Sequence, residues 1–231
     1  MAATEILTGQ IKDGTIARSD LNASTTGEAV IRKIVAGTLI NIGSTGVDAG
    51  TGDVTVNVTQ TGNRSFFVPA AAMWPSTTSG CTAIAKAETS TNKQNLQTLA
   101  FNDTSKQYAE FTVTMPDNWD GSTVTFKVVW TTAATSGNCI WELAARAYGD
   151  GNAIDGAWGS AVAITDTAQA TANSVLDTGE SGALTIANSP SAGKTIQFRI
   201  DRDAANGSDT MAGDALLIGA RIKYGISQFS H

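Results

Sequence analysis

The most regular feature of this chain is an alternation of apolar and polar residues that recurs between about residues 66 and 226. In the segment STVTFKVVW the residues on one face are Val124, Phe126, Val128 and Trp130. In TIQFRID the apolar face consists of Ile196, Phe198 and Ile200, and Gln197 and Arg199 lie opposite. A period of two predicts β-strands that bury one face and expose the other, as in antiparallel sheets.

Eight segments fit this pattern, and turn-rich sequences such as PDNWDGS and GDGNAIDG separate them. The segments are QTLAF, YAEFTVTM, STVTFKVVW, IWELAARAY, AVAITD, GALTIA, TIQFRID and ALLIGARIKYGI. Their number and spacing predict an all-β fold, an antiparallel jelly-roll β-sandwich over residues 65–231. In the last segment strict alternation places Leu216, Ile218, Ala220, Ile222 and Tyr224 on the core face. Trp130 and Trp141 are expected in the core as well.

The N-terminal part, residues 1–64, has a different pattern. AVIRKIV fits either a strand or one helical turn, and we favour a strand. GTLINIGSTGVDAGTGDVTVNV, residues 37–58, reads as two short alternating strands joined by glycine-rich turns. An isolated hairpin is marginally stable in water, so its apolar residues need a partner, most simply the same segment of another copy. The self-association candidates are Leu39, Ile40, Ile42, Val54, Val56 and Val58.

Composition excludes several classes of function. The net charge of −6 argues against nucleic acid as a partner. The sequence contains no run of about 18 apolar residues, so we expect no membrane-spanning helix. Its first residues do not have the pattern of a signal peptide, so we expect none. The single histidine is the last residue, His231. This excludes the usual Ser-His-Asp and Cys-His mechanisms, so we expect no enzymatic activity. Cys81 and Cys139 are compatible with a disulfide or with two free buried thiols, and we favour the thiols.

Two stretches carry a resemblance to a known family. QIKDGTIARSDLN and the segment GEAVIRKIVAGTLINIGSTGVDAGTGDVTVNV look like attachment and shaft segments of tailed-bacteriophage fibre proteins. The region from FFVPAAAMWPSTTSGC to RDAANGSDTMAGDALLIGARIKY is similar to a β-sandwich of phage virion proteins. The resemblance implies a homotrimer with a shaft over residues 1–64. It implies other virion proteins, of capsid or tail, as partners. It also implies that the protein is part of the virion and that the virion is assembled in the host cytoplasm.

Two tryptophans lie in polar, glycine-rich loops. Trp119 occurs in PDNWDGS and Trp158 in DGAWGS. An exposed indole beside polar groups can stack on a sugar ring, so Trp119, Asp120 and Trp158 are glycan-contact candidates. The alternative is that each indole covers a loop or a subunit interface.

Oxygen-rich loops suggest a second kind of site. DRDAANGSD provides Asp201, Asp203 and Asp209, which are compatible with Ca²⁺ but match no EF-hand pattern, and turns also favour Asp and Asn. No other cofactor is indicated. Carboxylate pairs such as Asp117 with Asp120 are typical of turns and do not by themselves indicate glycoside hydrolysis.

The basic residues of the N-terminal part permit two interpretations. Lys12, Arg18, Arg32 and Lys33 are either contacts that dock the protein on an acidic virion surface or an ordinary solvated face. The sequence as a whole predicts a short trimeric fibre or spike that presents a sandwich to host-surface glycans. The alternative is a capsid decoration protein that stabilises the shell and binds no host receptor.

Overall fold

The computed structural model describes residues 62–227. The predicted self-association residues, the predicted docking residues and His231 lie outside this range, and so does most of the predicted shaft, so these expectations stay predictions. In the described range no helix is long and apolar enough to cross a membrane.

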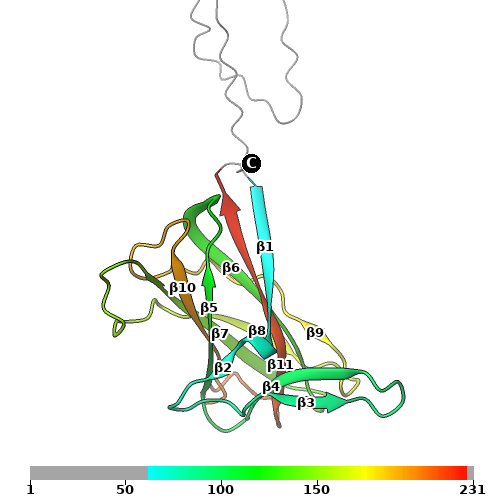
Figure 1. The fold of residues 1–231 in the computed structure, drawn as a ribbon. Helices are drawn as coiled ribbons and strands as arrows, with labels where there is room; N and C mark the ends of the chain where they lie inside the picture. The colour runs from blue at the N-terminus through cyan, green and yellow to red at the C-terminus, as the bar shows by residue number, and fades with distance from the viewer. Residues whose placement is uncertain (1–61, 228–231) are drawn as a thin grey trace, which may run out of the picture. The chain divides into compact units, whose positions relative to one another are not determined.

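Eleven strands and one short 3-10 helix make up the described region (Figure 1). In chain order they are β1 (Gly62–Pro69), η1 (Ala70–Ala72), β2 (Trp74–Pro75), β3 (Ala85–Glu88), β4 (Asn95–Phe101), β5 (Gln107–Thr114), β6 (Trp119–Thr131), β7 (Asn138–Tyr148), β8 (Val162–Thr167), β9 (Leu176–Asp177), β10 (Thr195–Arg202) and β11 (Ala215–Ile226). The expected all-β fold is confirmed. β1, which runs across the predicted boundary at residues 64 and 65, is an additional strand paired with β11.

The strands form two antiparallel sheets, which we name by a central strand of each. The β11 sheet has the order β3-β4-β11-β6-β9, with β1 also paired to β11. The β10 sheet has the order β2-β5-β10-β7-β8. Consecutive strands from β4 to β11 switch repeatedly between the sheets, which gives the strand order of a jelly roll. The predicted jelly-roll sandwich is therefore confirmed.

The core lies between the two sheets and is rich in aromatic rings. Trp130 of β6 and Trp141 of β7 are fully buried and meet edge to face across the sheets, with ring centroids 5.9 Å apart. Phe111 and Phe198 stack within the β10 sheet at 5.0 Å. Edge-to-face and offset stacked arrangements are the favoured geometries of aromatic pairs. The predicted core faces of β6 and β10 are thus confirmed, including Trp130 and Trp141.

Two details of the predicted strands are wrong. In β11 a bulge between Leu217 and Gly219 shifts the alternation, so Leu217 is fully buried, whereas Leu216 and Ile218, both predicted on the core face, are only half-buried. GALTIA, residues 182–187, is not a strand. It makes single bridges to Val124 in the β11 sheet and to Arg146 in the β10 sheet. A segment that crosses from one sheet to the other cannot pair along its length with either, although its Leu184 and Ile186 are buried.

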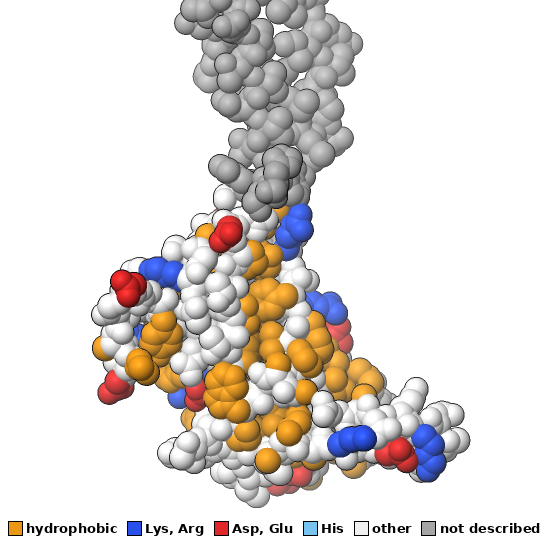
Figure 2. Space-filling model, in the orientation of Figure 1, with side chains coloured by type: hydrophobic (Ala, Val, Ile, Leu, Met, Phe, Trp, Pro, Cys, Tyr) orange, Lys and Arg blue, Asp and Glu red, His pale blue; other side chains and the backbone are white. Residues whose placement is uncertain are grey.

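Large apolar side chains also reach the surface. On the face shown in Figure 2, hydrophobic side chains gather along the middle of the domain, with acidic and basic residues mostly around its rim. The exposed large hydrophobic residues of the described region are Phe67, Trp74, Ile84, Leu96, Ile154 and Val175. Phe67, Leu96 and Ile218 contribute to a groove of about 420 Å³ beside β1 and the β3–β4 hairpin.

Candidate functional site

The outer face of the β10 sheet carries aromatic rings among hydrogen-bonding side chains, and we call it the aromatic face. Its members are Trp74 of β2, Tyr108 and Glu110 of β5, Gln197 and Arg199 of β10, Arg146 and Tyr148 of β7, and Trp158 of the loop after β7. The strand residues point outward because their neighbours in sequence, such as Phe111 and Phe198, fill the core. The alternation that builds the core therefore also builds this face.

Arg199 lies at the centre of the aromatic face and contacts two rings. Its Cζ atom is 4.5 Å from the ring centroid of Tyr108 and 4.8 Å from that of Trp158. Both distances are within the range of a cation–π contact. The Nε atom of Arg199 is buried and has no hydrogen-bond partner within the described residues. The guanidinium thus orients both rings and retains unused donor capacity.

A row of polar groups runs beside this centre. One Glu110 carboxylate oxygen accepts a hydrogen bond from Ser76 Oγ at 2.7 Å, and the other accepts one from Gln197 Nε2 at 2.5 Å. Glu110 is the register partner of Trp74 on one side and of Arg199 on the other. The Glu110 carboxylate and the Arg199 guanidinium therefore lie in one line across the strands, and the Gln197 amide lies two residues from Arg199 along β10. Together they provide both donors and acceptors.

The loop of residues 149–161 brings Trp158 to this face. Arg146 Nη1 donates to the carbonyl of Ala157 at 2.9 Å, and Tyr148 Oη donates to that of Ile154 at 3.0 Å. The loop passes close to the Arg146 guanidinium at Gly156, where an added Cβ would lie 2.1 Å from Arg146 Cζ. A side chain at this position would push the guanidinium aside, so glycine lets the loop lie against Arg146 without displacing it.

The residue after Trp158 is also a glycine for a geometric reason. β8 pairs with β7 only as far as Leu143. Beyond it, Gly159 N donates to the carbonyl of Ala145 at 3.2 Å. A Cβ on Gly159 would lie 2.8 Å from the carbonyl oxygen of Thr185 and 2.9 Å from that of Ala145. This close backbone approach fixes the point from which Trp158 projects.

A charged cluster occupies another part of the same sheet. Lys106 Nζ forms ion pairs with Glu142, with Asp201 at 3.2 Å and with Asp203 at 3.6 Å. Burial raises the pKa of Asp201 to about 7, although the Lys106 ammonium acts to lower it. The pKa of Lys106 is raised, because its hydrogen bond to Glu142 and the Asp201 charge outweigh the opposing effect of burial. The ammonium therefore occupies the space between these carboxylates.

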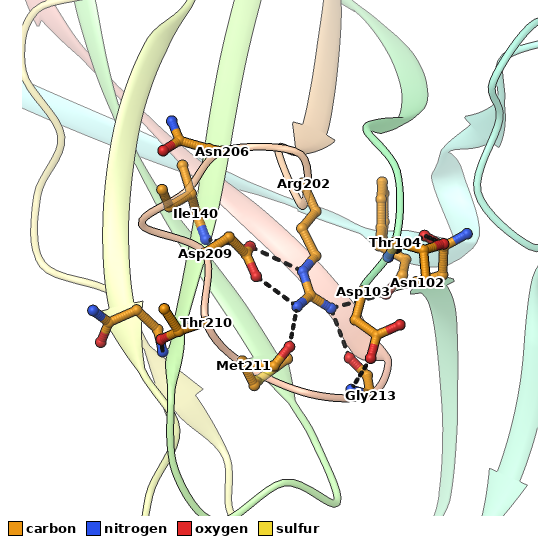
Figure 3. Close-up of polar contacts among 12 residues, drawn as sticks. Asn102, Asp103, Thr104, Ile140, Arg202, Asn206, Asp209, Thr210, Met211 and Gly213 are labelled. Atoms are coloured by element: carbon orange, nitrogen blue, oxygen red, sulfur yellow. Dashed lines mark hydrogen bonds and ion pairs between the residues drawn. The ribbon is translucent and has the colours of Figure 1, made fainter.

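The predicted calcium ligands do not converge, and this prediction is wrong. Asp201 and Asp203 face Lys106, whereas Asp209 binds the fully buried Arg202 through both oxygens, at 2.8 and 3.0 Å (Figure 3). Arg202 also donates to the carbonyls of Phe101, Gly213 and Met211, so all five of its N–H groups have acceptors. Within residues 62–227 no cluster of acidic, cysteine or histidine side chains could hold a metal ion. The Lys106 ammonium and the Arg202 guanidinium pair with the carboxylates that the sequence suggested for Ca²⁺.

The predicted glycan contacts are also separated in space. Trp119 is only 2 % exposed and belongs to the core, so its prediction as an exposed platform is wrong. β6 begins at Trp119, three residues before the alternating segment seen in the sequence, and the positive φ of Gly121 interrupts the alternation. Asp120 is exposed but lies on β6 in the β11 sheet, where it accepts a hydrogen bond from Ser122 N at 2.9 Å. Only Trp158, half-buried, lies on the aromatic face.

The structure also shows where the two cysteines and Asp117 lie. Cys81 and Cys139 are both buried and unpaired, which confirms the interpretation as free thiols. Burial raises the pKa of Cys81 to about 12, so its thiolate is disfavoured. Asp117 is exposed, like Asp120.

Sequence reasoning overlooked most of the aromatic face. Gln197 and Arg199 were placed opposite the core residues of their strand, and the same alternation in YAEFTVTM puts Tyr108 and Glu110 outward. A search for aromatic residues on the polar faces of strands would have found Tyr108. Trp74 gave no comparable signal, because β2 is only two residues long.

Comparison with known proteins gives no family for this chain. No family model and no curated protein matches its sequence. Among solved structures, a family 35 carbohydrate-binding module from Clostridium thermocellum is 11 % identical, with a TM-score of 0.39 over 69 % of this chain and 97 % of that module. A carbohydrate-binding module specific for non-crystalline cellulose, CBM28, is 16 % identical, with a TM-score of 0.39 over 65 % and 86 %. At these TM-scores the similarities assign neither a family nor a ligand, and the architecture of this chain rests on its own strand order.

Proposed function

We propose that the chain is a structural protein of a bacteriophage particle, a short trimeric fibre or spike, and that its sandwich binds host-surface glycans through the aromatic face. The virion role and the trimer rest on the resemblance of the N-terminal part to fibre segments. Glycan binding rests on one arrangement, in which Tyr108 and Trp158 both contact Arg199 beside the Glu110–Gln197 pair.

The chemistry of this arrangement suits a sugar. The carbon-bound hydrogens of a sugar ring pack against an aromatic ring, and the ring's hydroxyl groups both donate and accept hydrogen bonds. The aromatic face offers indole and phenol rings next to carboxylate, amide and guanidinium groups. We propose that this face binds the sugar without hydrolysing it.

A glycan array probed with the full chain tests the binding proposal. We expect specific glycans to be retained, and the variants Trp158→Ala and Tyr108→Ala to lose most of the signal. Phe67→Ala is the matched control. Phe67 is an exposed aromatic residue, 46 % accessible, on the β11 sheet, where it is the register partner of the exposed Arg221. An array on which the wild-type chain binds nothing, or on which Phe67→Ala weakens binding as much as Trp158→Ala, contradicts the proposal.

The alternative is a capsid decoration protein that binds no glycan. Antibody labelling of intact particles distinguishes the two, since a fibre or spike projects from its attachment point and a decoration protein covers the head. We expect label at discrete projections. Uniform labelling of the head together with an empty glycan array would favour decoration.

A further inference from the structure

The aromatic face has a second exposed indole, Trp74, which the proposed function does not use. Trp74 is 46 % exposed, and its register partner on β5 is Glu110. Register partners in an antiparallel pair project to the same face, so Trp74 lies on the outer face with Glu110. Its backbone is held on both sides, because Met73 is buried and Ser76 N donates to the carbonyl of Tyr108 at 3.2 Å.

Trp74 and the Arg199–Trp158 contact stand at two ends of one line across the strands. Trp74 is on β2 and Arg199 on β10, and β5 lies between them. Two strand spacings correspond to about 10 Å. Between the two ends lies the polar row already described, with Glu110 joined to Ser76 on one side and to Gln197 on the other. Hydrogen-bonding groups thus fill the interval between the two aromatic positions.

We propose that the ligand of this face is a neutral oligosaccharide that crosses the strands, with one sugar stacked on Trp74, another at Trp158 and the intervening unit bound by Glu110 and Gln197. This inference rests on the proposed function. A single sugar ring can stack on only one of two indoles at this separation, whereas a chain engages both. Linking the two contacts through one ligand increases affinity without any new type of contact.

The charges of the face favour a neutral chain. Arg199 is the register partner of Glu110, and Lys106 is shared by Glu142, Asp201 and Asp203. With Arg146 included, the aromatic face and this cluster together carry three basic and four acidic side chains. They therefore have no excess of positive charge to attract an acidic polysaccharide, and the chain as a whole carries a net charge of −6.

The test is the dependence of binding on ligand length. The probes are immobilised glucan, galactan, mannan and rhamnan oligosaccharides of one to eight units, and the protein is the full chain. For at least one series we expect the affinity to rise by about tenfold or more between one and four units, which corresponds to about 1.4 kcal/mol. Trp74→Ala should lower the affinity for four units to about that for one unit, whereas Trp158→Ala should weaken binding at every length.

Controls separate this inference from the proposed function. Trp74→Phe should retain part of the gain, Phe67→Ala should retain all of it, and thermal unfolding should show that Trp74→Ala remains folded. If the wild-type chain binds glycans but no series gains affinity with length, or if Trp74→Ala weakens all lengths by the same factor, the second position is wrong and the proposed function stands. If no glycan binds at any length, both fail.

Discussion

Two loops of this domain are each held by one arginine, and they differ in how completely that arginine is used. Arg202 is fully buried, and all five of its N–H groups donate to Asp209 or to backbone carbonyls of the loop at residues 203–214 and of Phe101. Arg146 holds the loop at residues 149–161 through the carbonyl of Ala157, and its buried Nε has no partner within the described residues. The saturated arginine stabilises the domain, whereas the unsaturated one positions a loop that presents Trp158 to the surface.

The comparison is tested most directly by removing the guanidinium groups of Arg202 and Arg146 in turn. Arg202→Met leaves the Asp209 carboxylate buried without its cation, and we expect a loss of about 3–5 kcal/mol in the free energy of unfolding. Arg146→Met removes an outer guanidinium that donates one hydrogen bond to the loop, at the carbonyl of Ala157, and we expect a loss of about 1 kcal/mol. Urea denaturation followed by tryptophan fluorescence measures both. Equal losses would show that the outer arginine is structural as well.

Asp201, the buried carboxyl group of the cluster around Lys106, makes the free energy of unfolding depend on pH. Burial raises its pKa in the folded state to about 7, whereas an unfolded aspartate has a pKa of about 3.9. The folded state therefore binds the proton more tightly, and the resulting stability is present at low pH and is lost as the pH rises from about 4 to about 7. Asp201→Asn should remove this contribution.

The measurement is urea denaturation of both proteins at several pH values. We expect the wild-type free energy of unfolding, relative to Asp201→Asn, to fall by roughly 1–3 kcal/mol between pH 4 and pH 8. Lys106, Glu142 and Arg199 surround the group and are unchanged in the variant. A difference that stays constant with pH, or that rises, would contradict the raised pKa.

The loop that presents Trp158 can be tested at its tightest point. Gly159→Ala places a Cβ 2.8 Å from the carbonyl oxygen of Thr185, so the backbone has to move. We expect a loss of about 1–3 kcal/mol in stability, since overpacked sites cost this much, together with weaker glycan binding. Gly179→Ala is the matched control, because its Cβ meets nothing within 4 Å, and it should change stability by less than about 0.5 kcal/mol. Unaltered stability and binding in Gly159→Ala would mean that the loop adapts freely.

The comparison also shows which parts of the molecule its sequence predicts. Alternation predicts the buried faces of β6 and β10 because side-chain direction along a strand depends only on position. It fails where the backbone leaves the regular ladder, as at the bulge after Leu217 and at Gly121 beside Trp119. Neither irregularity follows from the alternation of apolar and polar residues.

The candidate site was predictable only in part, for a related reason. The polar surroundings of Trp158 indicate its exposure, but Arg199, which contacts Trp158, and Tyr108, which contacts Arg199, come from two other strands. The sequence left the acidic loop open between a Ca²⁺ site and ordinary turns, and in the structure Asp209 of this loop pairs with Arg202. The flanking Asp201 and Asp203 pair with Lys106 instead, which comes from a part of the chain about 95 residues away and therefore could not be read from the loop itself.

The smallest expected effect concerns Asp120, which the sequence grouped with Trp158. The two residues belong to different sheets, because Asp120 lies on β6 next to Gly225 of β11 and Trp158 contacts Arg199 of β10. Asp120→Asn keeps an oxygen that can accept the hydrogen bond from Ser122 N, so stability should change by less than about 0.5 kcal/mol. Glycan binding should be unaffected on the same array that reports the loss in Trp158→Ala. A clear loss of binding in Asp120→Asn would move the site to the β11 sheet and would overturn the assignment of the aromatic face.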